Sequence, residues 1–281
     1  MVPRRKFGST GVAVPILGQG TWQMEHDDRA EAIRAIRRGL ELGLTHLDTA
    51  ELYGSGAVEE MVAEAMAGRR DEVFLASKVL PSNASRRGTI AACERSLKRL
   101  RTEVLDLYLL HWTGPHPLED TLAAFDQLVG AGKIRAFGVS NFDVRELEEA
   151  IRLAGPGRIA CDQVLYHLGE RYAERELLET CARHRVALVA YSPLGSGQFP
   201  SARSRGGQVL GEIAARHGAS PQQIALAFLT RDPNVFAIPK AARLEHAEAN
   251  AGAASIRLTP EEIRRIDVAF PVRRRSGLPV L

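Results

Sequence analysis

Four side chains with complementary chemistry stand at the ends of hydrophobic segments in this sequence of 281 residues. Asp48 and Tyr53 lie five residues apart after one such segment. Lys78 and His111 each close a later run of aliphatic residues typical of a buried strand. Carbonyl reduction needs such a set, because a hydride that reaches the carbonyl carbon leaves negative charge on the oxygen, where a proton donor and hydrogen-bond donors must meet it. We therefore interpret the four residues as a candidate catalytic site.

Each of the four residues can be given a role in this chemistry. Tyr53 would donate the proton, and because a free phenol has a pKa of about 10, an ammonium group beside it is expected to lower that pKa. Lys78 would supply the ammonium, Asp48 would keep it charged and oriented, and His111 would donate a second hydrogen bond to the carbonyl oxygen. Only five of the 37 Lys and Arg residues are lysine, so composition alone would place arginine, whose charge is effectively permanent, at this strand end.

Around these residues the sequence alternates between short apolar runs and longer helical patterns. A helix is expected over Asp28–Leu42, with Asp27 or Asp28 as its cap and Gly43 at its end. The runs that read as strands are 16–19, 45–48, 73–78, 106–110, 134–139, 160–164, 187–191 and 235–238. Eight β-then-α units with right-handed crossovers predict an α/β fold, a (β/α)8 TIM barrel, and an open doubly wound sheet is the alternative.

Segments outside the repeat also carry predictions. Arg4–Phe7 and Val12–Pro15 flank a Gly-Ser-Thr-Gly turn, which predicts a short N-terminal β-hairpin. The stretch Leu194–Gly207, rich in Gly, Ser and Arg, is long for a loop between a strand and a helix and is a candidate ligand-covering segment. No linker or low-complexity tract interrupts the chain, so residues 1–281 are interpreted as a single domain.

The active site of such a barrel forms at the C-terminal ends of the strands. Nearly every predicted strand closes on polar residues, which are Gln19 to Trp22, Asp48, Lys78, His111, Ser140, Asn141, Gln163, Tyr191, Ser192 and Lys240. One polar strand end would mean little, because Asn, Ser and Asp are common in turns. A polar residue at almost every strand end predicts that these side chains lie together at one mouth of the barrel. His46 and His167 lack such partners and are interpreted as structural.

Composition argues against several other classes of protein. With 45% hydrophobic and 25% charged residues the chain is of ordinary globular type, and its net charge of +3 is too small to indicate nucleic-acid binding. The basic segments Arg4–Lys6 and Arg273–Arg275 are interpreted as solvated tails. Cys93, Cys161 and Cys181 lack the spacing of a metal site or a disulfide framework and are expected in the core. The sequence shows no signal peptide or membrane span, which favours a cytoplasmic enzyme.

The motifs of the chain resemble, in the same order, those of the aldo/keto reductase family over essentially the whole length. They are Leu47-Asp-Thr-Ala-Glu-Leu-Tyr53, Ser77-Lys78, Leu109-Leu-His-Trp112, Gly138-Val-Ser-Asn-Phe142, Gln163-Val-Leu-Tyr-His167, Tyr191-Ser-Pro-Leu194 and Ile238-Pro-Lys240. Segments 50–53, 111–114 and 164–169 are most similar to bacterial reductases of methylglyoxal and other small aldehydes.

This resemblance implies a nicotinamide cofactor, usually NADPH and alternatively NADH, bound across the barrel mouth. The chain has no Gly-x-Gly-x-x-Gly motif after a strand, which agrees with a cofactor that no Rossmann fold holds. By position, the residues implied to bind the carboxamide and to stack on the nicotinamide ring are Ser140, Asn141, Gln163 and Tyr191. Those implied to follow the pyrophosphate are Ser192, Leu194 and Ser196. Those implied to border nicotinamide and substrate are Gly20, Thr21 and Trp22.

Lys240 stands where the family contacts the adenosine 2′-phosphate, and an ammonium group beside a phosphate is physically reasonable. The family often has Ser or Thr after this lysine and Arg six positions beyond it, whereas this chain has Ala241 and His246. Asn250 is retained, and Arg243 would compensate. The adenosine end of the cofactor is therefore assigned to Lys240, Arg243, His246 and Asn250, with NADPH as the expected cofactor.

Short segments after His111 and after Phe270 imply a shallow pocket for a small carbonyl substrate. Trp22 and Trp112 are expected to supply apolar walls beside Tyr53 and His111. Compact members of the family are usually monomers, which is the expectation here, and no nucleic-acid or membrane partner is expected.

The prediction as a whole is an NADPH-dependent oxidoreductase that reduces small aldehydes, ketones or dicarbonyls such as methylglyoxal to alcohols, without a metal. One alternative is a cofactor-binding sensor or partner subunit with little catalysis. Another keeps the barrel but makes Lys78 the Schiff-base nucleophile of an aldolase. That reading leaves Gln163, Tyr191 and Lys240 without roles.

Overall fold

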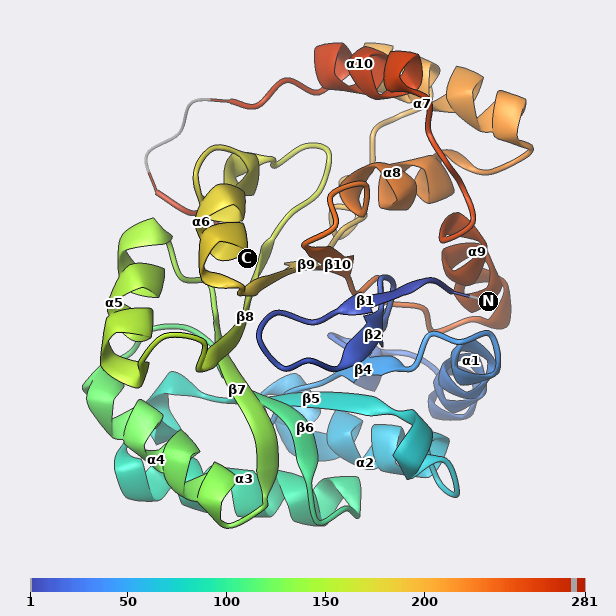
Figure 1. Cartoon of the computed structure of the whole chain (residues 1–281). Helices are drawn as coiled ribbons and strands as arrows, with labels where there is room; N and C mark the ends of the chain where they lie inside the picture. Colours follow the sequence, from blue (N-terminus) through green and yellow to red (C-terminus); the bar gives the residue numbers. More distant parts are fainter. Residues whose placement is uncertain (1, 274–276, 281) are drawn as a thin grey trace.

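The computed structural model describes residues 2–273 and 277–280, in which a parallel sheet of eight strands curls into a barrel (Figure 1). In chain order the strands are β3 (Gln19–Gly20), β4 (His46–Asp48), β5 (Phe74–Val79), β6 (Leu105–Leu110), β7 (Ile134–Ser140), β8 (Ile159–Leu165), β9 (Ala187–Tyr191) and β10 (Val235–Ala237). Each strand pairs with its neighbour in the chain. The (β/α)8 barrel is therefore confirmed, and the doubly wound sheet is not the fold.

The barrel closes where its first and last strands meet. Parallel bridges join Leu17 to Ala237 and Gly20 to Lys240. This seam consists of isolated bridges, because β3 is only two residues long. The predicted strand 16–19 therefore overlaps β3 only at its end, whereas the other seven agree with the structure to within one residue at each end.

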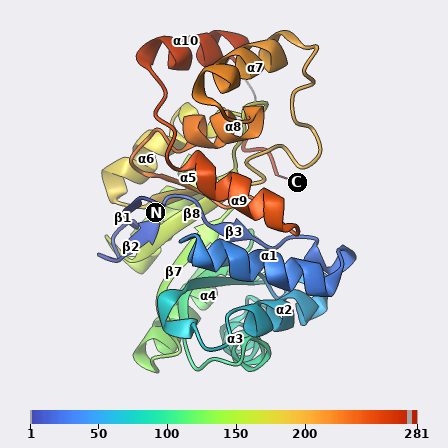
Figure 2. The same ribbon diagram turned by 90° about the vertical axis from the view of Figure 1, so that its right-hand side faces the viewer.

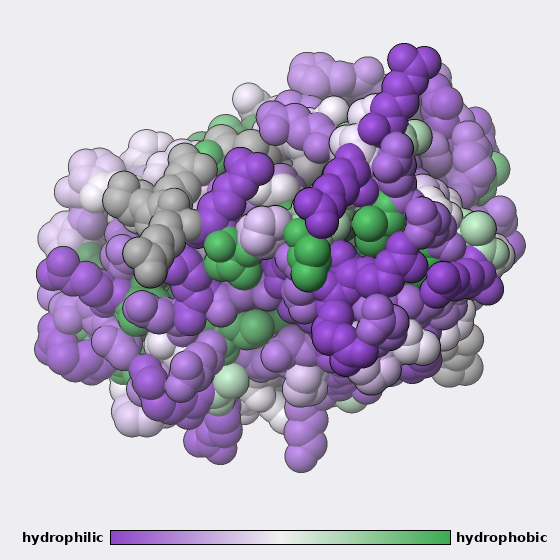
Figure 3. Space-filling model, turned by 90° about the horizontal axis from the view of Figure 1, so that it is seen from above, coloured by the Kyte–Doolittle hydropathy of each residue, from purple (hydrophilic) through white to green (hydrophobic). Residues whose placement is uncertain are grey.

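Helices surround the barrel on its outside (Figures 1 and 2). The α-helices are α1 (Arg29–Glu41), α2 (Ala57–Ala65), α3 (Arg86–Leu100), α4 (Leu118–Gly130), α5 (Val144–Ala154), α6 (Leu177–His184), α7 (Arg205–His217), α8 (Pro221–Leu229), α9 (Leu244–Ala253) and α10 (Pro260–Ala269). The 3-10 segments are η1 (Met24–His26), η2 (Tyr53–Gly56), η3 (Arg70–Glu72), η4 (Pro81–Asn83) and η5 (Tyr172–Glu174). On the face drawn in Figure 3, hydrophilic residues surround small hydrophobic patches.

Helix α1 shows how local sequence sets the ends of these elements. Its hydrophobic side chains recur every three or four positions and are buried. The side chain of Asp28 accepts a hydrogen bond from the amide of Glu31, so Asp28 is the cap and Asp27 is not. Gly43 follows the helix with a φ of 94°, a left-handed conformation that glycine adopts at low cost.

The predicted N-terminal hairpin consists of β1 (Arg4–Lys6) and β2 (Ala13–Pro15), and it lies across one end of the barrel (Figure 1). Phe7 is buried in a cluster with barrel residues such as Phe74. The ring of His46 packs edge-on against Phe7 at 5.8 Å between centroids, which agrees with a structural role for this histidine. Because this packing fills the N-terminal end of the barrel, the polar strand ends stand at the opposite, open mouth.

The interpretation of Arg4–Lys6 as a solvated tail is wrong, because these residues form a paired strand. Arg5 also donates a hydrogen bond of 2.6 Å to the backbone oxygen of Asp232, which ties the hairpin to the barrel. In the second basic segment Arg273 is exposed, and Arg274 and Arg275 lie outside the described residues.

The three cysteines are buried, as predicted, and each is a free thiol. Among residues 2–273 and 277–280 no group of His, Cys, Asp or Glu side chains is arranged to hold a metal ion. Within the same ranges, no helix has the length and the apolar character needed to cross a membrane.

Candidate active site

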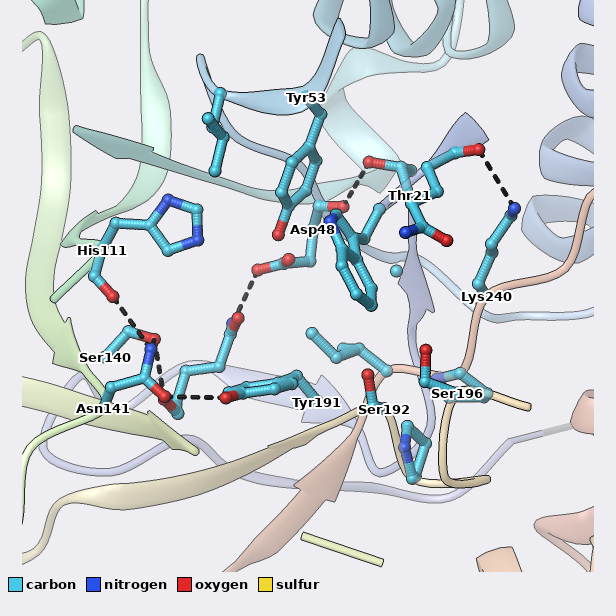
Figure 4. A pocket seen from close by; sticks show the side chains of 18 of the residues that line it. Thr21, Asp48, Tyr53, His111, Ser140, Asn141, Tyr191, Ser192, Ser196 and Lys240 are labelled. Atoms are coloured by element: carbon cyan, nitrogen blue, oxygen red, sulfur yellow. Dashed lines mark hydrogen bonds between the residues drawn. The ribbon is translucent and has the colours of Figure 1, made fainter. Parts of the chain in front are cut away.

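A cavity of about 360 Å³ opens at the C-terminal ends of the barrel strands (Figure 4). The predicted site residues that line it are Gly20, Thr21, Trp22, Asp48, Tyr53, His111, Trp112, Ser140, Asn141, Gln163, Tyr191, Ser192, Leu194, Ser196 and Lys240. Lys78 is completely buried and meets the cavity only through the residues that it contacts. Neither His46 nor His167 lines the cavity.

The centre of the site is Lys78, whose ammonium group contacts three oxygen atoms. Its Nζ lies 2.5 Å from Oδ1 of Asp48 and 2.9 Å from the backbone oxygen of Thr49. A third contact of 3.3 Å reaches the hydroxyl of Tyr53. Strands β4 and β5 are paired in register, so residues 25 to 30 positions apart in the sequence form one hydrogen-bonded cluster.

The ion pair is buried, since the side chains of Lys78 and Asp48 are each 1% exposed. Such a pair is stable only when further hydrogen bonds satisfy its remaining atoms. The amide nitrogen of Gln163 donates to Oδ2 of Asp48 over 2.8 Å. Burial lowers the pKa of Lys78, but Asp48 and Tyr53 together raise it above its ordinary value. The lysine is therefore a charged ammonium group.

The prediction that Tyr53 has a lowered pKa is wrong. Burial of the phenol raises its pKa, Lys78 lowers it and Asp48 raises it again, so that the pKa lies above the ordinary value of 10.0. The physical reason is that burial disfavours the charged phenolate and the carboxylate of Asp48 repels it, so that together they outweigh the ammonium group of Lys78. Tyr53 is therefore neutral and carries its proton at neutral pH.

His111 packs beside Tyr53, with ring centroids 5.9 Å apart and ring planes at 74°. Burial, and next the charge of Lys78, lower the pKa of His111 to about 2. The imidazole is therefore neutral and has one N–H group to donate. The phenol of Tyr53 and the imidazole of His111 border the same part of the cavity (Figure 4).

A chain of hydrogen bonds fixes the polar groups next to these residues. The hydroxyl of Tyr191 donates to Oδ1 of Asn141 over 2.8 Å. The amide nitrogen of Asn141 donates to the backbone oxygen of His111 over 3.1 Å. The hydroxyl of Ser140 donates to the backbone oxygen of Gln163 over 2.8 Å. The ring of Tyr191 is thereby anchored at its hydroxyl while it lines the cavity (Figure 4).

The segment after β9 turns sharply at the mouth of the barrel. Ser192, Gly195, Ser196 and Gly197 have φ angles between 46° and 86°. Among the described residues, no hydrogen-bond acceptor is found for the backbone N–H groups of Leu194, Ser196 and Gly197. Free N–H groups in such a turn form a concave surface that binds anions. This part of the predicted ligand-covering segment is therefore suited to a phosphate group.

Lys240 follows β10 and lines the cavity. Its ammonium group lies 2.6 Å from Oδ2 of Asp27 and 3.2 Å from the backbone oxygen of Gln23. In contrast, Arg243, His246 and Asn250 do not line the cavity. Arg243 stands at the N-cap position of α9 without a capping side-chain hydrogen bond and is exposed, as is His246, whereas Asn250 is buried. Their assignment to the adenosine end of a cofactor stays a prediction.

Sequence reasoning missed several residues of the lining, namely Gln23, Leu52, Pro193, Gly197, Ile238, Pro239 and Val280. Most of them lie beside or inside the motifs quoted above, so their position in those motifs was an available signal. No motif marks Val280, which lies beyond the last helix. Leu52 and Val280 are 40% and 54% exposed and Trp112 is 36% exposed, so apolar side chains stand open at the rim, as a shallow pocket requires.

The sequence model of the aldo/keto reductase family matches residues 16–270. The chain belongs to this family. The methylglyoxal reductase YeaE of Escherichia coli (strain K12) is 45% identical over 269 residues, which cover 94% of this chain and 93% of the relative. The glyoxal reductase of Bacillus subtilis (strain 168) is 35% identical over 263 residues, which cover 92% and 89%. The crystal structure of an aldo/keto reductase from Klebsiella pneumoniae with NADP and acetate aligns over 100% of both chains, with a TM-score of 0.93 and 40% identity.

Membership in this family makes the chain an NAD(P)H-dependent oxidoreductase. The donor groups of the cavity fit such a cofactor. The amide and hydroxyl groups are those of Ser140, Asn141 and Gln163, and the ring of Tyr191 lines the cavity next to them. Free N–H groups lie in the turn after β9, and Lys240 supplies an ammonium group. These are the groups that a carboxamide, a nicotinamide ring, a pyrophosphate and a further phosphate require.

Proposed function

We propose that this aldo/keto reductase uses NADPH to reduce small aldehydes, ketones and dicarbonyls such as methylglyoxal to alcohols, with Tyr53 as the proton donor. The observation that carries the proposal is the contact of 3.3 Å between the hydroxyl of Tyr53 and the ammonium group of Lys78, which is itself paired with Asp48. The substrate class is supported by the names of two relatives, a methylglyoxal reductase and a glyoxal reductase. The NADP in the Klebsiella pneumoniae structure supports the cofactor.

Tyr53 enters the reaction with its proton, because its pKa lies above the ordinary value. As negative charge develops on the carbonyl oxygen, the bond between the phenol oxygen and its proton breaks and a bond from that proton to the carbonyl oxygen forms. The resulting phenolate lies beside the ammonium group of Lys78, which stabilises it strongly because the site is buried. Asp48 positions Lys78 through their contact of 2.5 Å.

His111 acts as a hydrogen-bond donor and not as an acid. Its pKa of about 2 keeps the imidazole neutral at neutral pH, so it cannot supply a proton in exchange with solvent. A neutral imidazole can still donate one N–H group to the carbonyl oxygen. Together, Tyr53 and His111 would orient that oxygen so that the phenol proton reaches it.

NADPH, when bound, supplies the hydride. Ser140, Asn141 and Gln163 would hold its carboxamide, and Tyr191 would stack on the nicotinamide ring. The amide nitrogen of Gln163 already donates to Asp48, which leaves the carbonyl oxygen of this side chain for the ligand. The orientation of the ring would thus be coupled to the carboxylate that holds Lys78.

The other end of the cofactor would lie along the turn after β9. The groups proposed to hold the pyrophosphate are the hydroxyls of Ser192 and Ser196 with the free N–H groups of Leu194, Ser196 and Gly197. Lys240 is proposed to bind the 2′-phosphate, with Arg243, His246 and Asn250 toward the adenosine. Gly20, Thr21 and Trp22 would border the nicotinamide.

The substrate would occupy the outer part of the cavity. Trp22, Leu52 and Trp112 line this region with apolar surface. A cavity of about 360 Å³ that also holds a nicotinamide ring leaves room for a small carbonyl compound. We further propose that the chain acts as a single-domain monomer in the cytoplasm. Its buried, unpaired cysteines are compatible with a reducing compartment, and light scattering of the purified protein tests the monomer.

The first experiment follows the absorbance of NADPH or NADH at about 340 nm with methylglyoxal as substrate. It compares wild type with Tyr53→Phe and with Tyr108→Phe, a matched control because Tyr108 is fully buried and does not line the cavity. Wild type and Tyr108→Phe should oxidise NADPH. Tyr53→Phe should lose turnover by about 100-fold or more, because general-acid catalysis contributes about 10²–10⁴-fold, and should still bind NADPH.

Turnover by Tyr53→Phe at the wild-type rate would contradict its role as proton donor. If wild type binds NADPH tightly but reduces no member of a panel of small aldehydes, a cofactor-binding sensor or partner subunit becomes the better reading. The Schiff-base alternative requires a free amine at Lys78, which three oxygen contacts and a raised pKa argue against. If borohydride traps a carbonyl substrate covalently on Lys78, the Schiff-base alternative is supported.

A further inference from the structure

Asp27 pairs with the one ammonium group that lines the cavity within the described residues. Its Oδ2 lies 2.6 Å from Nζ of Lys240. Asp27 has no role in capping α1, because Asp28 provides the cap. Apart from Lys240, Oδ2 has no partner among residues 2–273 and 277–280. The pair with Lys240 is therefore the interaction that places this carboxylate.

The pair spans the seam of the barrel. Lys240 follows β10 and forms a bridge with Gly20, whereas Asp27 follows η1 on the other side of the seam. The backbone oxygen of Gln23 also accepts a hydrogen bond from Lys240 over 3.2 Å, and Gln23 lines the cavity. Gln23 has a φ of 61°, which is costly for a residue other than glycine. One ammonium group thus contacts both ends of the segment 23–27, of which Gln23 lines the cavity.

We propose that Asp27 is a specificity-determining residue, which competes with the 2′-phosphate of NADPH for Lys240. This inference rests on the proposed function, in which Lys240 binds that phosphate. A carboxylate and a phosphate dianion both require the same ammonium group, and their like charges repel each other. The side chains of Lys240 and Asp27 are 35% and 32% exposed, so the carboxylate is free to turn toward water when a phosphate replaces it.

The competition affects only one of the two nicotinamide cofactors. NADH carries no 2′-phosphate and leaves the pair of Asp27 and Lys240 intact. NADPH has to displace the carboxylate and to tolerate its charge nearby. Asp27 therefore narrows the difference in affinity between NADPH and NADH, and loss of its charge should widen that difference in favour of NADPH.

The test measures the Kd of NADPH and of NADH by quenching of tryptophan fluorescence, since Trp22 and Trp112 line the cavity. The variants are Asp27→Asn, Lys240→Ala and the matched control Asp28→Asn. The control removes one negative charge at the next residue, keeps the pair with Lys240, and keeps the helix cap because Asn caps as well as Asp. Asp27→Ser, which also lacks the charge, provides a second variant if Asp27→Asn does not fold.

The expected result is that Asp27→Asn lowers the Kd of NADPH by about three- to fivefold, as for a partly exposed charge pair. The Kd of NADH should change by less than about twofold, and Asp28→Asn should leave both values unchanged. Lys240→Ala should weaken NADPH selectively and remove the effect of Asp27→Asn in the double variant, because the competition acts through this lysine.

Two results would overturn the inference and leave the proposed function standing. In the first, Asp27→Asn leaves the Kd of NADPH unchanged or raises it although Lys240→Ala weakens NADPH selectively. In the second, Asp28→Asn tightens NADPH as much as Asp27→Asn, which would show a general field effect. If Lys240→Ala changes NADPH and NADH alike, the proposed phosphate site itself fails, and the inference fails with it.

Discussion

Replacement of Lys78 by methionine should destabilise the folded protein by about 3–5 kcal/mol, because it leaves the carboxylate of Asp48 buried without its cation. Both side chains are 1% exposed and their charged atoms lie 2.5 Å apart, so water cannot take the place of the ammonium group. The amide of Gln163 still donates to Asp48 over 2.8 Å. This remaining hydrogen bond is expected to keep the loss toward the lower end of the range.

The same reasoning predicts a recovery when both charges are removed. The double variant Lys78→Met with Asp48→Asn buries no charge at this pair and keeps an amide oxygen as acceptor for Gln163. Its stability should return to within about 1–2 kcal/mol of wild type. Neither variant should reduce methylglyoxal, because neither has an ammonium group beside Tyr53. The double variant should therefore regain stability without regaining activity.

Urea unfolding followed by circular dichroism measures both free energies, and thermal unfolding checks them. Unfolding entropy is about 2.1 cal/mol/K per residue, or about 0.6 kcal/mol/K for a chain of 281 residues. A loss of about 3–4 kcal/mol should thus lower Tm by about 5–7 °C. The reasoning is refuted if Lys78→Met is as stable as wild type, or if the double variant is less stable than Lys78→Met.

Two further predictions concern protonation. Asp162 is fully buried with Oδ2 unpaired among the described residues, and burial raises its pKa well above the ordinary value. Its contribution to stability is therefore present below the unfolded pKa of about 3.9 and is lost as pH rises through the folded pKa. Asp162→Asn should stabilise the protein at neutral pH by about 1–3 kcal/mol, and less at about pH 4; a gain that does not depend on pH in urea unfolding would contradict this. Reductase activity should show no inflection from Tyr53 or His111 between about pH 5 and pH 9, because the pKa of Tyr53 is raised above 10.0 and that of His111 is lowered to about 2. A pH profile of kcat/KM checks this, and an inflection near pH 6.5 that disappears in His111→Gln would show a titrating imidazole.

Much of the fold could be predicted because its repeat is local. Each buried strand is a short apolar run and each helix has a periodic apolar face, so Asp48 and Lys78 could be assigned to strand ends from their neighbours in the sequence. Parallel pairing in register then brings such ends together. Closure at β3 was harder to predict, because a strand of two residues has no periodic pattern.

Side-chain identity and local pattern were sufficient to place a carboxylate, a phenol, an ammonium and an imidazole at one mouth of a barrel. Three-dimensional packing decided the protonation states of these groups and their ion-pair partners. The pKa of Tyr53 is raised because burial and Asp48 outweigh Lys78, and Lys240 is paired with Asp27 because the seam joins the two ends of the barrel. A pKa and an ion pair depend on burial and on every charge within a few ångströms, and those neighbours come from segments far apart in the chain.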